Sequence, residues 1–382
     1  MKRKNFYASL FNLALLLVVP ASLCMISCSG EVTAASEDVA ETEDEIILNV
    51  TFDGKPLDMT RAITAPVNDI YFYAYQGNTR KAANVRYTLD GTIWKAYSTK
   101  ITWPSSAAIS IFGLSDSYKD VLLDNMKERY IHYDIDPDAP HDVYYGSTLN
   151  TTKAKSGGNV NMNFTRLVSR VHFSCKNSMA DGQVHINRIE VHNLVRSGKF
   201  AYNEKTNGAG TWTLLDAWGT YGKDVPVAVV NPKVAKQQVT SNDDSFILIP
   251  QNTSKTKWAT TADNPVTLTA ADAAHQVYLA VYCKVYKESE AGSGVWDHCV
   301  WGNDDYKPIY LPLAKSWSKS NSATTIVFDI GQGFKADGSA WEPDAGDVIT
   351  FSESMQLEPD EDDEGNVDTW EENSEDVFSV GL

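Results

Sequence analysis

The stretch Ile46-Ile47-Leu48-Asn49-Val50-Thr51-Phe52 is the clearest structural signal in this sequence. One face of the stretch would carry Ile46, Leu48, Val50 and Phe52. This alternation is the period of a β-strand with one buried face. The residues that follow, Asp53-Gly54-Lys55-Pro56, end the strand, because Gly and Pro favour turns. The folded part of the chain is therefore expected to begin with a strand.

Short runs of the same kind recur along the chain. Strands are predicted at 69–75, 84–89, 101–103, 107–112, 160–164, 167–175, 185–193, 245–249, 276–286, 295–302, 306–313, 325–330 and 347–351. Only Ser117–Tyr130 has apolar residues at helical spacing. This pattern predicts an all-β protein, and a length of 382 residues fits two β-sandwiches better than one large barrel. The polar stretch Lys176–Gly182 suggests the division, which gives sandwich domains at 46–178 and 179–382.

The first residues of the chain are typical of a secretory signal. A basic start, Met1-Lys2-Arg3-Lys4, precedes the apolar run 10–20. The pair Ser27-Cys28 resembles the lipobox of bacterial lipoproteins, in which a small residue precedes the cysteine that is acylated. We therefore interpret 1–27 as a lipoprotein signal peptide, Cys28 as the lipidated residue of an outer-membrane protein and 28–45 as an acidic tether. The alternative is ordinary signal cleavage that leaves Cys28 as a plain thiol.

Composition excludes two classes of protein. The net charge is −17, and cleavage before Cys28 lowers it to −20. So acidic a chain is not expected to bind nucleic acid, which requires clustered Lys and Arg. A hydrophobic share of 43% is enough for folded cores and argues against a wholly disordered chain. Twelve acidic residues between Glu353 and Asp376, with no Lys or Arg among them, carry much of the charge.

Sequence signatures of catalysis and of bound groups are missing. The chain has no His-Glu-x-x-His, Gly-x-Ser-x-Gly or phosphate-loop motif, so we expect no enzyme and no cofactor. The seven histidines show no metal-ligand spacing, and no resident metal is expected. The stretch 360–371 nearly fits a calcium-binding loop, but a solvated acidic linker matches it as well.

Two further residue types leave alternatives open. Cys283 and Cys299 fall on two strands of an expected hairpin, where they could form a disulfide or remain free thiols. The ten tryptophans would mostly be buried, but exposed ones could stack on sugar rings. A surface lipoprotein that binds carbohydrate is therefore the rival interpretation.

The order of several motifs resembles the fimbrillin family, the pilus subunits of Bacteroidales-type bacteria. The matching pieces are Thr60-Arg61-Ala62, Asp69–Tyr75, Trp94, Ile101–Pro104, Ala108–Phe112, Asp142–Ser147, Val160–Phe164, Leu167–Phe173, Phe246–Gln251, Leu311–Leu313, Trp317 and Ile326–Ile330. The Ile-Pro-Gln end of Phe246–Gln251 is the most specific. Thr165 and Arg166 depart from the family, where many members have a histidine, and the acidic run Glu358–Gly365 looks like an insertion. Whether the subunit belongs to a stalk, a tip or an accessory position stays open.

The resemblance implies a fold and an assembly mechanism. It implies two tandem transthyretin-like β-sandwich domains, export as a lipoprotein to the cell surface and assembly into a fimbrium that serves adhesion. A protease would remove the first strand, and a strand of the next subunit would fill the groove. Arg61 would be the site cut by an Arg-specific protease, unless it is an ordinary surface arginine. The released strand would carry Ile46, Leu48, Val50 and Phe52. The donor strand would lie within Thr369–Val380, with Trp370, Val377, Phe378 and Val380 as its apolar residues. Its partners would be other pilus subunits, the protease and, through the lipid, the outer membrane.

Overall fold

The structure is a computed structural model that describes only part of the chain. The described residues are 44–52, 55–56, 67, 69–90, 93–115, 130–138, 140–241, 244–252, 267–313, 316–333, 335–339, 341 and 376–378. All of them belong to one compact unit, Glu43–Leu382. Their helical elements are short: α2 Lys153–Ser156, α3 Leu268–Ala273 and the 3-10 turn η3 Ile330–Gln332. No helix within these ranges is long and apolar enough to cross a membrane. The all-β prediction is confirmed, whereas the predicted helix at 117–130 falls almost wholly outside the described ranges.

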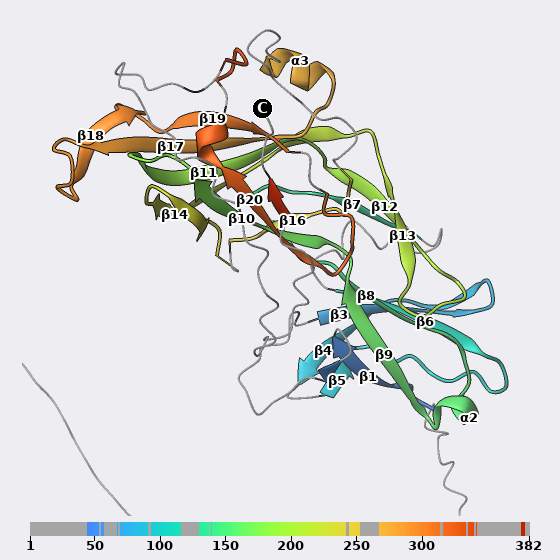
Figure 1. The fold of residues 1–382 in the computed structure, drawn as a ribbon. Helices are drawn as coiled ribbons and strands as arrows, with labels where there is room; N and C mark the ends of the chain where they lie inside the picture. The colour runs from blue at the N-terminus through green and yellow to red at the C-terminus, as the bar shows by residue number, and fades with distance from the viewer. Residues whose placement is uncertain are drawn as a thin grey trace, which may run out of the picture. The chain divides into compact units, whose positions relative to one another are not determined.

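Eight strands form the first sheet, in the order β2-β1-β9-β8-β6-β3-β4-β5 (Figure 1). Their bounds are β1 Ile47–Phe52, β2 Lys55–Pro56, β3 Asp69–Gln76, β4 Thr79–Asp90, β5 Ile93–Ala96, β6 Ile109–Ser115, β8 Tyr144–Thr151 and β9 Asn159–Arg166. β1 runs parallel to β9, and the other pairs are antiparallel. β9 shows why the strands form: its even-numbered apolar residues Val160, Met162 and Phe164 are buried, and its asparagines are exposed.

Two five-stranded sheets make a sandwich from later residues. One has the order β15-β10-β20-β21 with β16 also on β10, and the other has β14-β11-β17-β18 with β19 also on β17. Their bounds are β10 Ser169–Asn177, β11 Gln183–Val195, β14 Trp218–Val230, β15 Val234–Gln238, β16 Phe246–Leu248, β17 Tyr278–Glu288, β18 Trp296–Trp301, β19 Lys307–Pro312, β20 Ala323–Asp329 and β21 Asp376–Phe378. Phe246 joins the two layers, since its ring contacts Phe173 of β10 at 5.1 Å and Tyr221 of β14 at 4.9 Å.

A three-stranded sheet, β13-β12-β7, packs on the first sheet. It consists of β7 Tyr130–Asp134, β12 Ser197–Tyr202 and β13 Gly210–Leu214. Tyr202 lies 4.7 Å from Phe112 of β6, and Phe200 lies 5.7 Å from Tyr145 of β8, as ring centroids. β7 precedes the domain division suggested between residues 178 and 179, and β12 follows it, yet the two strands pair. The position of that division stays a prediction.

The main difference from expectation is the segment between residues 194 and 244, where no strand was predicted. β12, β13, β14 and β15 all lie there. In β13 and β15 every residue is exposed or half-buried, and β14 buries few of its thirteen. A half-buried strand is recognised in a sequence by its alternating apolar and polar residues, and a strand that buries few side chains lacks this alternation. The strand expected at 347–351 lies outside the described residues.

Candidate functional site

Backbone pairing holds β1 on both of its sides. On one side β1 runs parallel to β9 over all six of its residues, so that Phe52 stands opposite Phe164. On the other side the pairing is short. Just before the strand, Ile46 N donates to Ile101 O at 2.8 Å, and at the end of the strand only β2 pairs with it. β1 therefore has a single full-length neighbour among the residues that the structure describes.

The apolar face of β1 is part of a core. The exposed fractions of its inward side chains are 3% for Leu48, 8% for Val50 and 7% for Phe52, and Ile46, just before the strand, is 0% exposed. They belong to one cluster with Val160, Met162 and Phe164 of β9 and with Ile101 and Trp103. Burying an aliphatic or aromatic side chain of this size contributes about 1.5–3 kcal/mol. Removal of β1 would thus expose a continuous apolar groove.

Phe52 occupies the most aromatic part of this groove. Its ring meets Tyr144 edge-on at 5.4 Å, Phe164 at 5.6 Å and Trp94 at 6.4 Å, measured between ring centroids. Space for Phe164 comes from Gly113 of β6, because a Cβ there would lie 2.3 Å from the Phe164 ring. An aromatic side chain at position 52 is thus enclosed by three rings.

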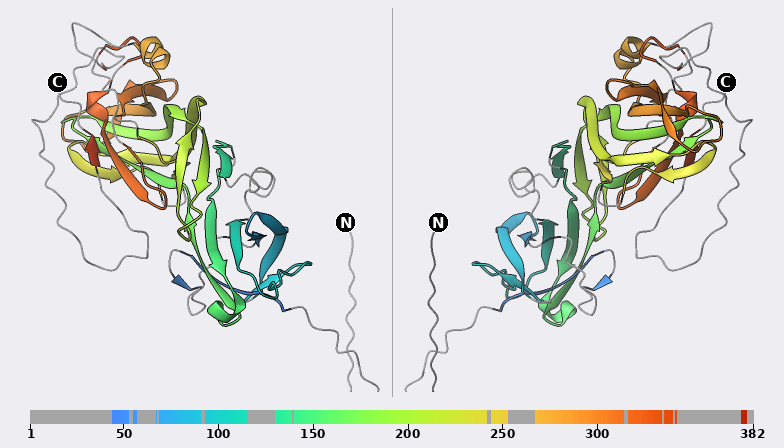
Figure 2. Two further views of the ribbon diagram at one scale, coloured as in Figure 1. Left: turned by 90° about the vertical axis from the view of Figure 1, so that its right-hand side faces the viewer. Right: turned by 90° about the vertical axis from the view of Figure 1, so that its left-hand side faces the viewer.

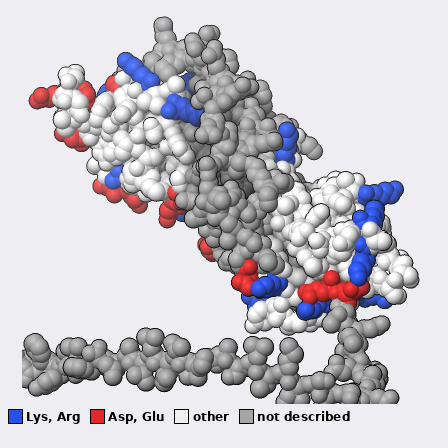
Figure 3. Space-filling view, turned by 90° about the horizontal axis from the view of Figure 1, so that it is seen from below, with Lys and Arg blue, Asp and Glu red and all other residues white. Residues whose placement is uncertain are grey.

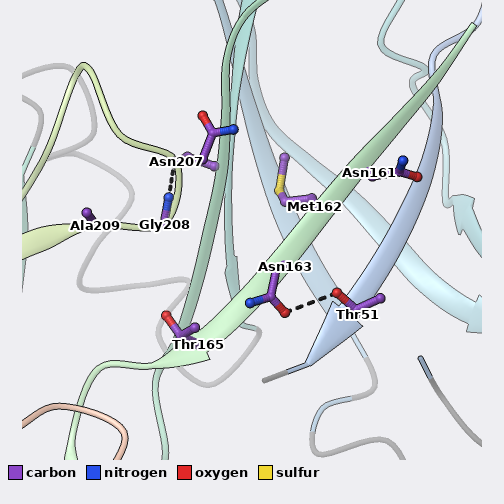
Figure 4. A pocket seen from close by; sticks show the side chains of 9 residues that line it. Thr51, Asn161, Met162, Asn163, Thr165, Asn207, Gly208 and Ala209 are labelled. Atoms are coloured by element: carbon purple, nitrogen blue, oxygen red, sulfur yellow. Dashed lines mark hydrogen bonds between the residues drawn. The ribbon is translucent and has the colours of Figure 1, made fainter. Parts of the chain in front are cut away.

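The outward face of β1 is polar and hydrogen-bonded to β9. Asn49 Nδ2 donates to Asn161 Oδ1 and Thr51 Oγ1 donates to Asn163 Oδ1, each at 3.0 Å. Figure 4 shows Thr51 and Asn163 pointing toward each other at the edge of an open cleft of about 380 Å³. The turn 207–209 forms the opposite wall of the cleft. β1 and β9 thus match in both their apolar and their polar residues.

Two ion pairs hold the residues that lead into β1. Lys100 Nζ lies 2.5 Å from Glu45 Oε2, and Lys153 pairs with Asp44. On the face drawn in Figure 3, positively charged and negatively charged side chains lie next to one another. Exposed pairs of this kind contribute roughly 0–1 kcal/mol each, so the apolar face provides most of the attachment of β1.

A buried charge cluster lies directly beside the aromatic site. Arg166, which is 1% exposed, pairs with Asp142 at 2.8 Å between Nε and Oδ1, and Arg170 pairs with the other carboxylate oxygen at 2.6 Å. Arg166 also donates to the hydroxyl of Tyr144 at 2.8 Å, the tyrosine whose ring packs on Phe52. In the sequence, Arg166 stands out only as a departure from the pattern of the family that the chain resembles. No sequence signal links it to Asp142.

The other predicted site residues are described partly or not at all. Cys28, Arg61, Trp370 and Val380 lie outside the described residues, and so does the possible calcium loop at 360–371. Of Val377 and Phe378 only the backbone is described, as part of β21. β21 pairs in parallel with β20, from Asp376 opposite Ile326 to Phe378 opposite Phe328 (Figure 2).

The cysteines, the potential metal ligands and the tryptophans give little support to a disulfide, a metal site or a carbohydrate-binding surface. Cys283 and Cys299 are free thiols, because Cys299 pairs with Tyr286 across the hairpin. Burial raises the pKa of Cys283, which makes its thiol unreactive. Within the described ranges no three His, Cys, Asp or Glu side chains gather as a metal site. Trp218 is the one described tryptophan that is exposed, at 40%, and its ring stacks on His275 at 4.6 Å.

Comparison with known proteins gives one family match. A family model described as fimbrillin-like matches residues 60–293. Among solved structures, a fimbrial protein from Bacteroides vulgatus is similar with 13% identity and a TM-score of 0.52, over 75% of this chain and 94% of its own. At such low identity this similarity shows a shared fold.

Two more solved structures are similar at lower scores. A putative cell adhesion protein from Bacteroides ovatus has 11% identity and a TM-score of 0.42, over 82% of this chain and 99% of its own. The tip fimbrial protein Mfa3 from Porphyromonas gingivalis has 10% identity and a TM-score of 0.31, over 64% of this chain and 86% of its own. No curated protein matches the chain significantly.

Proposed function

This chain belongs to the fimbrillin-like family, and on that premise we propose that it is a fimbrial subunit that assembles by exchanging its first strand. Family membership also bears out the expectation from sequence that the protein is not an enzyme. In the proposed mechanism a protease cuts after Arg61, β1 leaves, and a strand of another subunit fills the vacated groove. Such head-to-tail addition of strands produces an open filament.

The burial of β1 is the observation that carries this proposal. Its inward residues Leu48, Val50 and Phe52, together with Ile46 just before the strand, pack on residues that follow Arg61 in the sequence. A cut at Arg61 would therefore leave the strand attached only by noncovalent contacts. Its departure would expose an apolar groove to water, which is unfavourable. It would also leave the edge of β9 unpaired, and such an edge readily pairs with another strand.

Location at the cell surface follows from the family, and attachment through a lipid on Cys28 is part of the proposal. Lipidation would hold the uncut chain at the outer membrane. A cut at Arg61 would separate the rest of the chain from the segment 28–61, which carries both the lipid and β1. Labelling with radioactive palmitate checks this step. The label is expected in the full chain, and its absence from a Cys28→Ala variant would assign it to that cysteine.

Digestion of the full chain with an Arg-specific protease tests the assembly. We expect a new N-terminus at Ala62, loss of the β1 peptide and oligomers that resist detergent until they are boiled. The Arg61→Ala variant should remain monomeric. Arg80→Ala is the matched control, because Arg80 is an exposed arginine of β4, and it should assemble normally. A chain that is cut at Arg61 and stays monomeric, or an Arg61→Ala variant that polymerises, would refute the proposal.

A further inference from the structure

Tyr144 of β8 contacts both Phe52 of β1 and Arg166 of β9. The ring of Phe52 meets the Tyr144 ring edge-on, with 5.4 Å between the centroids. The guanidinium of Arg166 lies over the Tyr144 ring, with Cζ 5.4 Å from the centroid, and its Nη2 donates to the Tyr144 hydroxyl at 2.8 Å. Tyr144 and Arg166 are each 1% exposed. Phe52 is therefore part of the apolar cover that keeps water away from this pair.

The contacts of Arg166 continue into the sandwich that contains β10. Arg166 is the last residue of β9, and its Nε lies 2.8 Å from Oδ1 of Asp142. Arg170, near the start of β10, pairs with Oδ2 of the same carboxylate at 2.6 Å. The amide of Arg170 donates to Ser322 O at 2.9 Å, just before β20. The charge cluster of Arg166, Asp142 and Arg170 therefore attaches the first sheet, in which β1 lies, to β10.

On the premise of the proposed function, in which β1 leaves after cleavage at Arg61, we propose that the charge cluster couples the Phe52 site to β10. While the site is filled, the Arg166 end of the cluster is dry and the cluster holds the start of β10 firmly. When the site is empty, water reaches Tyr144 and Arg166, and the start of β10 opens more often. Cleavage thus changes the sandwich as well as the groove.

Water has this effect because a dry ion pair is much harder to break than a hydrated one. Arg166 fixes the position of Asp142 while their pair is dry, since breaking it would leave a buried guanidinium without its carboxylate. When water enters, it solvates the separated charges, and their attraction weakens about fourfold as the effective dielectric constant rises from about 20 toward 80. The cation–π contact of Arg166 with Tyr144 is also weaker when it is hydrated. A carboxylate that Arg166 holds less firmly anchors Arg170 less firmly too.

Coupling of this kind acts in both directions, because it is an equilibrium property that the two sites share. If an empty Phe52 site loosens Arg170, then loosening Arg170 must weaken the affinity of the groove for β1. Arg170→Gln removes the charge that Asp142 meets at Oδ2. Arg188→Gln is the matched control, because Arg188 belongs to β11 of the same sandwich, is 36% exposed against 26% for Arg170, and also pairs with carboxylates, here two of its own sheet.

The affinity of the groove for β1 is measured with a peptide. The full chain is cleaved at Arg61, and the monomeric fraction that has lost β1 is titrated with a labelled synthetic peptide of residues 44–56. We expect Arg170→Gln to weaken binding at least about fivefold, the lower end of typical coupling between sites, and Arg188→Gln to leave it unchanged. Equal affinities in the two variants would overturn the coupling while the proposed function stands. A parent chain that keeps β1 after cleavage would overturn both.

Hydrogen exchange at the amide of Arg170 tests the coupling without any substitution in the chain. We expect exchange to be faster in the cleaved monomeric chain than in the uncut chain. The peptide of residues 44–56 should restore the slow rate, whereas at equal occupancy its Phe52→Ala version should not. The amide of Val281 in β17, which lies in the other sheet of the sandwich, is the control and should keep its rate. Exchange at Arg170 that is unchanged by loss of β1, or that rises together with exchange at Val281, would overturn the coupling.

Discussion

The ring of Phe52 in β1 lies 6.4 Å from the ring of Trp94 in β5, although the two strands stand near opposite ends of the eight-stranded sheet. The sheet therefore curls until its two edge regions meet, and Phe52 closes the core between them. The strand proposed for removal is thus also the one that completes this core. Each subunit would need a replacement strand to restore the contact with Trp94.

Truncation of Phe52 should destabilise the uncut chain strongly. Phe52→Ala removes a buried ring from three aromatic neighbours and leaves a cavity, which typically costs about 3–5 kcal/mol. Ile47→Ala is the matched control, because Ile47 is in the same strand but 54% exposed, and it should change stability by less than about 0.5 kcal/mol. Urea unfolding followed by circular dichroism measures both. Similar losses in the two variants would contradict the role of Phe52.

The buried pair of Arg166 and Asp142 should matter far more than an exposed one. Arg166→Ala leaves Asp142 without its buried partner and removes the donor to Tyr144, and loss of one member of such a pair costs about 3–5 kcal/mol. Lys95→Ala breaks the exposed pair with Asp90 and is expected to cost at most about 1 kcal/mol. Chemical denaturation compares the two. An Arg166→Ala variant as stable as Lys95→Ala would refute this ranking.

How much could be predicted depended on burial. The alternation from Ile46 to Phe52 was readable because one face of β1 is buried and the other is exposed. β14 was missed, although it has thirteen residues, because most of its side chains have access to solvent. Strands are predicted from the alternation of apolar and polar residues, so a strand that buries few side chains is difficult to predict from the sequence.

The residues that β1 contributes to the candidate site could be predicted from the sequence, whereas the residues that surround β1 could not. The inward residues of β1 follow from their period, but their partners do not. The parallel register that brings Thr51 to Asn163 joins residues more than a hundred positions apart, as does the polar contact of Asn49 with Asn161. The approach of Trp94 depends on the curl of the whole sheet. Such contacts are set by topology, which local pattern does not encode.

Acidification should reveal the ion pairs on the outer face of β11. Burial by itself would raise the pKa of Glu190, but hydrogen bonds from Arg188 and His192 outweigh it and hold the pKa below its ordinary value of 4.5. A carboxylate with a depressed pKa stabilises the fold above the ordinary pKa, and this contribution is lost as the pH falls through the folded value. At pH 7 Glu190→Gln should be less stable than the parent, and the gap should shrink as the pH drops below 4.5. Unfolding free energies measured across that range check the sign, and a gap that widens in acid would contradict it.

Departure of β1 after cleavage should change the fluorescence of the chain. Trp94 is 5% exposed beneath Phe52, so loss of the strand should admit water to its indole and shift the emission to longer wavelengths. Phe52→Ala should speed this shift, because the cut strand then has fewer contacts to break. Trp94→Phe should remove much of the shift, whereas Trp218→Phe, which alters an already exposed ring, should preserve it. Emission recorded after addition of the Arg-specific protease, with the released peptide followed by mass spectrometry, gives both rates. Release of the peptide without any shift, in cleaved chain that is still monomeric, would mean that Trp94 stays covered and that β1 does not close the core.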